Sequence, residues 1–321
     1  MALNRGRAAR VLLLAATLAL SGCSADGGGN GVATYVDAAI AEMRDGIHAD
    51  TDEFRDAVAR AEPELKAKAT IAATYHGLSE LAAVAGGVHS WLMTPADVSS
   101  IAEQNAPGAS FPVPTVSTRD GISVLTLPRF QGEEPEAVER YASSGREAMR
   151  AAAASTDCGW IVDLRANGGG NAWPMLAVAA PLLDDGDVVG LKRGEVVQWA
   201  HVDDGGVVST PGGDDTASAG GFAIDAPVAL LTSGVTASAA EIVAIAFAGQ
   251  ADAVRVGKPT AGLTTGNEAR ELRDGARLIL TTTYDVDRTG RVYDGPLVPD
   301  VEVAPGPDTE AARAAVRERC S

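Results

Sequence analysis

Hydrophobic residues recur at steps of three and four between residue 33 and about residue 100, which is the spacing of amphipathic helices. The apolar positions that follow this spacing are Tyr35, Ile40, Met43, Phe54, Val58, Leu65, Ile71, Leu78 and Leu81. The pattern predicts a small helical N-terminal domain at residues 33–105. Pro107, Pro112 and Pro114 then interrupt the helical spacing.

Short apolar runs alternate with helical spacing in the remainder of the chain. We predict a hairpin at 113–117 and 122–127, a helix at 133–153, a strand at 160–164, a helix at 173–183, a hairpin at 188–191 and 196–202, a strand at 227–232, a helix at 239–248, and strands at 253–256 and 277–283. Residues 203–221 are polar and glycine-rich, so we expect a surface loop there. Strands that alternate with helices predict an α/β core, at residues 106–321.

The first 22 residues have the composition of an export signal. Three arginines precede an apolar run from Val11 to Leu20, which is too short to span a bilayer comfortably. The sequence LSGC at 20–23 then has the form of a bacterial lipobox. We expect a signal peptide at residues 1–22, acyl chains on Cys23, and a flexible tether at 23–32. The alternative is an ordinary signal peptide with an incidental cysteine.

Charge and composition narrow the class of protein. The formal charge is −17, and removal of residues 1–22, with three arginines and no acids, makes it −20. Such an acidic chain is a poor nucleic-acid binder, so we expect none as a partner. With 46% hydrophobic and 21% charged residues, the chain is typical of a folded protein. We expect it outside the cytoplasm, anchored by lipid to the bacterial cell membrane.

Two cysteines remain beyond Cys23. Because exported proteins meet oxidising conditions, we expect Cys158 and Cys320 to form a disulfide. A bridge between them closes a long loop and constrains the unfolded chain by roughly 5 kcal/mol in the chain-entropy model. The alternative is two unrelated thiols.

Five blocks in the second half of the chain occur in an order that resembles peptidase family S41. They are DLRANGGG at 163–170, TASAAEI at 236–242, GKPTAG at 257–262, DG at 274–275 and PDV at 299–301. The family includes carboxyl-terminal processing proteases, tricorn and interphotoreceptor-retinoid-binding-protein relatives. The resemblance covers about residues 120–303 and implies a crotonase/ClpP-like α/β core with a helical N-terminal domain packed against it.

Ser238 matches the nucleophile of that family. From the residues alone, Ser-Ala-Ala-Glu at the start of an apolar helix is also typical of a capping box, and this explanation stays open. Small neighbours leave the hydroxyl uncovered, and the helix dipole favours a developing oxyanion near the N–H of Ala239. By resemblance, Gly169 donates to the oxyanion, with Gly170 as its neighbour. A plain tight turn is the alternative for these glycines.

The general base differs from that of the processing proteases. Their lysine follows a Gly-x-x-Thr-x-Gly segment, but here Leu263 follows Gly262. The sequence GGVHS at 86–90 resembles the histidine segment of the tricorn branch, so we assign His89 as base. Lys258 is the alternative base.

A third group is expected to orient the imidazole. The related branch uses a carboxylate shortly before its Pro-Asp element, and Asp294 is the nearest candidate. An ordinary turn aspartate is an equal alternative.

The resemblance implies an extracytoplasmic serine peptidase that hydrolyses peptide bonds through an acyl-enzyme, without a metal or other cofactor. Peptides or proteins would be its substrates. The span between His89 and the core is too short for the PDZ domain of processing proteases, so tail specificity is not expected. The competing hypothesis is a catalytically inactive S41-like lipoprotein that binds a peptide or hydrophobic ligand. The missing lysine favours it, and the presence of Ser238 and His89 opposes it.

Overall fold

The structure is a computed structural model that describes residues 30–104, 106, 108–211, 220–303 and 308–320. The predicted signal peptide, Cys23 and most of the predicted tether lie outside the described residues. Within the described part of the chain, no helix has both the length and the apolar character needed to cross a bilayer.

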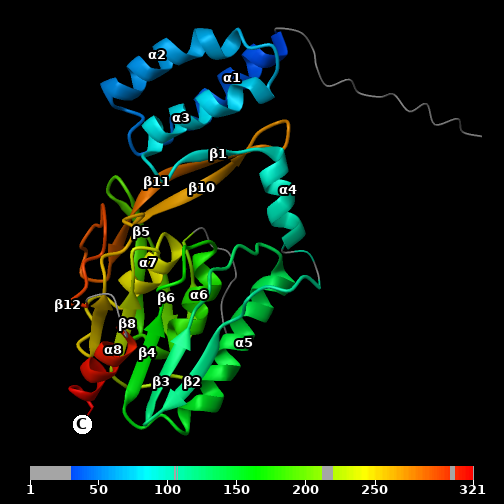
Figure 1. The fold of residues 1–321 in the computed structure, drawn as a ribbon. Coiled ribbons are helices and arrows are strands. Elements are labelled where there is room, and N and C mark those ends of the chain that lie inside the picture. The colour runs from blue at the N-terminus through cyan, green and yellow to red at the C-terminus, as the bar shows by residue number, and fades with distance from the viewer. Residues whose placement is uncertain (1–29, 105, 107, 212–219, 304–307, 321) are drawn as a thin grey trace, which may run out of the picture.

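Three α-helices form the layer at the top of Figure 1. They are α1 (Asn30–Met43), α2 (Asp52–Lys66) and α3 (Tyr75–Gly86), with the short 3-10 helix η1 (Ala72–Thr74) before α3. Thr51 caps α2, because its hydroxyl accepts a hydrogen bond from the N–H of Phe54. Most of the predicted helix-face residues are buried in one hydrophobic cluster. The helical prediction is therefore confirmed for this region, which continues into β1 (Trp91–Met93) and α4 (Pro95–Gln104).

A six-stranded sheet forms the core, in the order β12-β9-β8-β4-β3-β2. Its strands are β2 (Thr115–Arg119), β3 (Ile122–Thr126), β4 (Gly159–Asp163), β8 (Val228–Thr232), β9 (Ala253–Gly257) and β12 (Val301–Glu302). Neighbours are parallel except β2 and β3, which form the predicted hairpin. Side chains alternate along β4, so Trp160 and Val162 join one hydrophobic cluster and Ile161 joins another on the opposite face.

Helices cover both faces of this sheet, as parallel strands require. The helices are α5 (Pro135–Ala153), α6 (Ala172–Ala179) with η2 (Ala180–Leu182), α7 (Ala239–Ala246) and α8 (Asp308–Arg317). The first three share a cluster with alternate strand residues, whereas Ala312, Ala315 and Val316 of α8 pack on the other face. A disulfide joins Cys158, just before β4, to Cys320 beyond α8, with the two Cα atoms 5.1 Å apart.

The second sheet connects the core to the helical layer. Its order is β1-β11-β5-β6-β7, and β10 also pairs with β11. Its remaining strands are β5 (Gly186–Arg193), β6 (Val196–Asp203), β7 (Gly206–Ser209), β10 (Thr265–Glu271) and β11 (Arg277–Asp287). β7 lies inside the segment predicted as a loop at 203–221, so that prediction is wrong there. This polar segment forms a strand because it pairs with β6, and its sequence alone does not predict that pairing.

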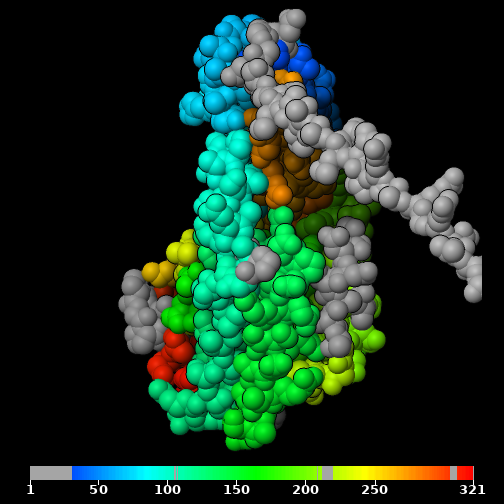
Figure 2. All heavy atoms as spheres, turned by 90° about the vertical axis from the view of Figure 1, so that its right-hand side faces the viewer, coloured from blue at the N-terminus to red at the C-terminus, as the bar shows by residue number. Residues whose placement is uncertain are grey.

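The hairpin of β10 and β11 reaches into the helical layer (Figure 1). Leu278 and Leu280 of β11 belong to the hydrophobic cluster of the N-terminal helices. The hydroxyls of Tyr35 and Tyr75 donate to the carboxylate of Asp274 in the hairpin turn, at 3.1 and 2.6 Å. Figure 2 shows α4 in cyan alongside the orange hairpin, between the helical layer and the core. The hairpin thus connects the N-terminal helices to the rest of the fold.

Candidate active site

Ser238 lies in the sharp turn between β8 and α7. Its φ of 53° and ψ of −120° place it in a region that residues with a side chain rarely adopt. Such strain costs on the order of 1–3 kcal/mol and concentrates at functional sites. A strained serine between a strand and a helix has its hydroxyl presented at the edge of the sheet. The capping box predicted from the sequence is also present at the start of α7, but a helix cap does not by itself require this strained backbone.

Gly169 is in direct contact with this turn. Its φ is +95°, and a Cβ atom there would lie 2.8 Å from the Cβ of Ser238 and 2.8 Å from the carbonyl oxygen of Ala237. Both the conformation and the contact exclude a side chain. The glycine loop predicted from the sequence thus meets the predicted nucleophile.

Hydrogen bonds fasten the two loops together. The hydroxyl of Thr236 donates to the carbonyl of Leu164 at 2.9 Å, and the N–H of Ala237 donates to the carbonyl of Asn167 at 3.2 Å. Asn167 is itself fully buried. These contacts fix the distance between the glycine loop and Ser238 before any substrate binds.

The candidate oxyanion donors are not equivalent. The N–H of Gly169 already donates to Oδ1 of Asn167 at 2.9 Å. Within the described part of the chain, the N–H groups of Gly170 and Ala239 donate no hydrogen bond. Gly170 is exposed, with φ at +125°. In this structure the available pair of amides is therefore Gly170 and Ala239, whereas the sequence resemblance pointed first to Gly169.

Glu241 ties the nucleophile turn to the loop that follows β9. This carboxylate is fully buried, and its Oε2 accepts from the N–H of Ser238 at 2.7 Å and of Leu263 at 2.9 Å. Its Oε1 accepts from the N–H of Gly262 at 2.9 Å and from the hydroxyl of Thr260. Burial raises the pKa of Glu241, and these four donors oppose that shift. Glu241, predicted as one member of a capping box, thus holds the turn in which Ser238 has its strained backbone conformation.

His89 lies in the turn between α3 and β1, 7% exposed. Its Nδ1 is 2.9 Å from the hydroxyl oxygen of Thr265 at the start of β10. Burial lowers the pKa of His89 to about 4, so the imidazole is neutral at neutral pH. With Nδ1–H donating to Thr265, the Nε2 lone pair is the site that accepts a proton. The side chain that contacts Nδ1 of His89 in this structure is thus Thr265, whereas the sequence resemblance pointed to Asp294.

The segment around His89 is fixed to the hairpin. The N–H of Thr281 donates to the hydroxyl of Ser90 at 2.9 Å, and the Nδ2 group of Asn267 donates to the carbonyl of His89 at 3.0 Å. A Cβ on Gly86 would lie 2.2 Å from the hydroxyl oxygen of Ser90. The sequence GGVHS is thus explained by close packing against β11 as well as by the imidazole.

Residues 263–265 connect the two predicted catalytic residues. Leu263 is hydrogen-bonded to Glu241, which holds Ser238, and Thr265 contacts His89. Two residue steps span at most about 7 Å. Among the described residues, no hydrogen bond joins the Ser238 hydroxyl to His89. Such bonds are often long before substrate binds, so proton transfer requires the imidazole and the hydroxyl to approach each other.

In the described part of the chain, no hydrogen bond or ion pair joins Asp294 or Lys258 to Ser238 or His89. Asp294 is exposed. The pKa of Tyr284, the cross-strand partner of Thr265, is raised mainly by the burial of Tyr284 and secondly by the charge of Asp294. Lys258 is half-buried, and its backbone is paired with Thr232 at the end of β8. Within the described residues, no three or more His, Cys, Asp or Glu side chains gather into a metal site.

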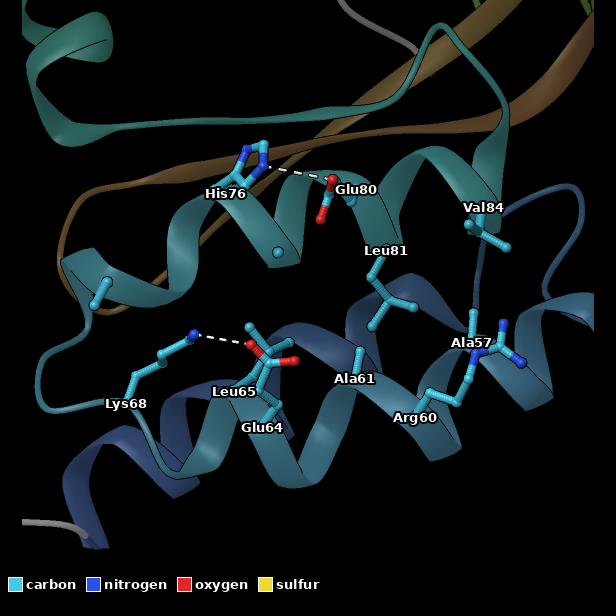
Figure 3. Close-up of a pocket in the computed structure, with 12 residues that line it drawn as sticks. Ala57, Arg60, Ala61, Glu64, Leu65, Lys68, His76, Glu80, Leu81 and Val84 are labelled. Carbon is cyan, nitrogen blue, oxygen red and sulfur yellow. Dashed lines mark hydrogen bonds and ion pairs between the residues drawn. The ribbon is translucent and has the colours of Figure 1, made fainter.

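A separate pocket of about 360 Å³ lies between α2 and α3 (Figure 3). Apolar side chains such as Ala61 and Leu81 line it, and Lys68 pairs with Glu64 at its edge, at 2.9 Å. It contains neither His89 nor Ser238, so it is distinct from the candidate active site.

Known proteins resemble the chain over nearly its whole length. It is 29% identical over 272 residues to a nisin-resistance protein of Lactococcus lactis subsp. lactis, which covers 84% of this chain and 82% of the relative. The solved structure of a lipoprotein from Streptococcus agalactiae has a TM-score of 0.75 at 23% identity, covering 90% of this chain and 96% of that one.

A photosystem II D1 C-terminal processing protease is a more distant structural neighbour, with a TM-score of 0.59 at 14% identity over 89% of this chain and 97% of that one. At these identities the two solved structures establish the fold. The mixed α/β fold predicted for the family is thereby confirmed. The family model described as peptidase family S41 matches residues 121–303, more than half of the chain. The chain therefore belongs to peptidase family S41.

Proposed function

We propose that this protein is an extracytoplasmic serine peptidase that cleaves peptide bonds through an acyl-enzyme on Ser238, with His89 as general base. Family membership supports the peptidase class. The observation that carries the assignment of Ser238 is its strained φ of 53° against Gly169, where a Cβ would lie 2.8 Å from the serine Cβ. A structural helix cap needs neither feature.

The reaction follows from the groups at the site. Nε2 of neutral His89 takes the hydroxyl proton as the Ser238 oxygen attacks the substrate carbonyl carbon. The N–H groups of Gly170 and Ala239 donate to the oxyanion. The imidazolium then gives its proton to the leaving amine, and the peptide C–N bond breaks. Water, deprotonated by His89, hydrolyses the ester and regenerates Ser238.

The orienting group in this mechanism is Thr265, whose hydroxyl oxygen lies 2.9 Å from Nδ1 of His89 and accepts from it in the tautomer whose Nε2 takes the proton. A neutral hydroxyl stabilises the imidazolium less than a carboxylate does. Asp294 stays a prediction for a third catalytic group, since the next residue, Gly295, is hydrogen-bonded to Thr264 beside Thr265. Lys258 stays the alternative base.

The substrate is proposed to be a cationic peptide. The acidic chain, with a formal charge of −17, attracts positively charged peptides and repels acidic ones. A relative that is 29% identical is named a nisin-resistance protein, which makes nisin the first peptide to test. We further propose that acyl chains on Cys23 hold the enzyme at the outer face of a bacterial membrane, where exported peptides are encountered.

The test is hydrolysis of nisin and of a charge-reversed, acidic control peptide by the purified protein, followed by mass spectrometry. Cleavage of nisin by the wild type, with no cleavage by Ser238→Ala, supports the proposal. Cleavage that persists in Ser238→Ala excludes Ser238 as nucleophile. A preference for the acidic peptide excludes the proposed substrate class.

A binding protein without catalysis is the second candidate. Two observations favour it: Leu263 replaces the lysine of the processing proteases, and no hydrogen bond joins His89 to Ser238 within the described residues. Calorimetry with the same peptides separates the two functions. Binding without any cleavage over prolonged incubation supports the binding protein.

A further inference from the structure

Asp285 is a fully buried carboxyl group whose two oxygen atoms have no hydrogen-bond partner among the described residues. It lies on β11, which pairs with β10, the strand that begins at Thr265. Its neighbour Asp287, two residues further along the strand, accepts bonds from Thr289, Arg291 and the hydroxyl of Tyr293. An ionised carboxylate without donors in such a site is strongly disfavoured, whereas a protonated acid is tolerated.

The backbone of Asp285 lies between two segments of the site. Its N–H donates to the carbonyl of Thr264 at 3.2 Å, next to Thr265, and its carbonyl accepts from the N–H of Tyr293 at 2.9 Å. On the adjacent strand β5, the residue opposite Asp285 is apolar Leu191. The charge that acts on Asp285 comes from Glu241 on α7. α7, which carries Glu241, packs against β11, which carries Asp285. The two residues also hold the same segment, because Leu263 donates to Glu241 and the next residue, Thr264, accepts from the N–H of Asp285.

Two buried carboxyl groups that interact do not both ionise readily, so one proton is retained by the pair. Glu241 accepts four hydrogen bonds, which stabilise its charged form. Asp285 accepts none from side chains or backbone in the described part of the chain. Burial, followed by the charge of Glu241, raises the pKa of Asp285 well above its usual range. The difference in hydrogen bonding favours Asp285 over Glu241 as the group that keeps the proton.

We propose that Asp285 is a positioning residue that keeps its proton, so that Glu241 can remain ionised. The ionised Glu241 in turn holds the backbone of Ser238 in its strained conformation. The positioning role rests on the proposed function of Ser238, whereas the protonation does not. Loss of the proton would place a second negative charge beside Glu241. That repulsion would weaken the bonds from Glu241 to Ser238 and Leu263.

The protonation is tested by infrared spectroscopy, which distinguishes the carbonyl stretch of a protonated acid from the bands of a carboxylate. We compare Ser238→Ala with Ser238→Ala/Asp285→Asn and Ser238→Ala/Asp287→Asn at neutral pH. The expected result is a protonated-acid band that disappears only with Asp285→Asn. A band that is absent from Ser238→Ala, or that survives Asp285→Asn, overturns the proposal. This readout needs no activity, so it is independent of the proposed function.

The positioning role is tested by the rate at which a fluorophosphonate labels Ser238, from neutral to alkaline pH. Asp285→Ala is expected to lower the neutral-pH rate about tenfold, and Asp285→Asn to recover much of that loss, because an amide reproduces the shape and neutrality of the acid. The wild-type rate is expected to fall reversibly as Asp285 ionises at alkaline pH. Asp285→Asn lacks this fall.

The labelling results distinguish a failure of the positioning role from a failure of the proposed function. If Asp285→Asn shows the same alkaline fall as the wild type, Asp285 is not the group responsible, and the positioning role is wrong. Wild-type protein that does not label at any pH overturns the proposed function and the positioning role, while the infrared result still decides the protonation. If Asp285→Ala does not fold, Asp285→Asn against wild type still decides the pH profile.

Discussion

The Nδ1 atom of His89 lies 2.9 Å from the hydroxyl oxygen of Thr265, two residues beyond Leu263, whose N–H is bonded to Glu241. This short segment links the element that carries the predicted base to the turn that carries Ser238. The N-terminal helices act on the site through the same hairpin, because β10 begins at Thr265 and β11 packs among the helices.

Replacement of Thr265 tests the orientation of the imidazole. Thr265→Val removes the acceptor for Nδ1–H at nearly constant volume, so the ring loses its preferred tautomer. We expect the kcat for peptide cleavage to fall about 10- to 100-fold with a smaller change in KM. Thr265→Ser keeps the hydroxyl and is expected to retain most activity. Equal losses in the two variants would contradict an orienting hydroxyl.

The pH dependence of acylation follows from the buried imidazole. Because burial lowers the pKa of His89 to about 4, its base form persists below the usual pKa of 6.5. We expect kcat/KM to fall on the acid side with a midpoint near that lowered value. A midpoint at the ordinary histidine value would show that the working imidazole is solvated.

The same pKa shift predicts an effect on stability. Between the unfolded value of 6.5 and the folded value of about 4, the unfolded chain binds more protons than the folded chain. The free energy of unfolding contributed by His89 is therefore present above pH 6.5 and falls by about 3 kcal/mol as the pH drops through this window. Urea unfolding of the wild type and of His89→Gln at several pH values in this window measures the free energy of unfolding. The wild type is expected to show the pH-dependent loss assigned to His89, and the variant is expected not to show it.

Gly169→Ala tests the contact between the glycine loop and Ser238. The added Cβ would lie 2.8 Å from the serine Cβ at a φ of +95°, so one of the two loops must move. We expect kcat/KM to fall at least about 100-fold. Gly168→Ala is the matched control, because the nearest atom to its Cβ is 3.9 Å away. Similar activity in both variants would argue against a precise fit at position 169.

Glu241→Ala tests the support behind the nucleophile. It leaves the N–H groups of Ser238, Gly262 and Leu263 without their acceptor. Because each unsatisfied buried donor costs about 1–3 kcal/mol, we expect the free energy of unfolding to fall by several kcal/mol, together with a loss of activity. Chemical denaturation measures the first effect. A fully stable Glu241→Ala protein would show that these bonds are replaced.

Removal of the disulfide is expected to destabilise the fold. The bridge between Cys158 and Cys320 closes a segment with a sequence separation of 162 residues. In the chain-entropy model the double variant Cys158→Ser/Cys320→Ser therefore loses roughly 5 kcal/mol of stability. Urea unfolding of oxidised wild type and the double variant measures the loss. A loss no larger than that of an exposed serine substitution would contradict a bridge in the native protein.

The sequence was most informative where an apolar strand, a glycine or small-residue loop and a helix follow one another. β4 and β8 are continuous apolar runs buried on both faces, so local composition identifies them to within one or two residues. The loops that follow carry Gly169 and Ser238. Local sequence alone left these two residues as a tight turn and a helix cap, and the family resemblance was needed to predict that they form one site.

The elements that the sequence did not predict depend on distant partners. β10 has the polar sequence TGNEARE, and it becomes a strand through its pairing with β11. Thr265 was consequently missed as the partner of His89. α8 was missed as well, although its apolar residues recur at helical spacing and pack against the core sheet. The hydrogen bond from the N–H of Gly169 to the Asn167 side chain, which led us to propose Gly170 as a donor, is not specified by any sequence pattern.

A nucleophilic Ser238 activated by His89 is the central feature of the proposed mechanism. Labelling of the purified protein with a fluorophosphonate, with mass-spectrometric identification of the modified residue, measures this reactivity. We predict one label on Ser238, no label in Ser238→Ala, and a labelling rate at least about 100-fold lower in His89→Ala than in Lys258→Ala. Wild-type protein that labels no more than Ser238→Ala, or a rate that depends on Lys258 and not on His89, would contradict the account.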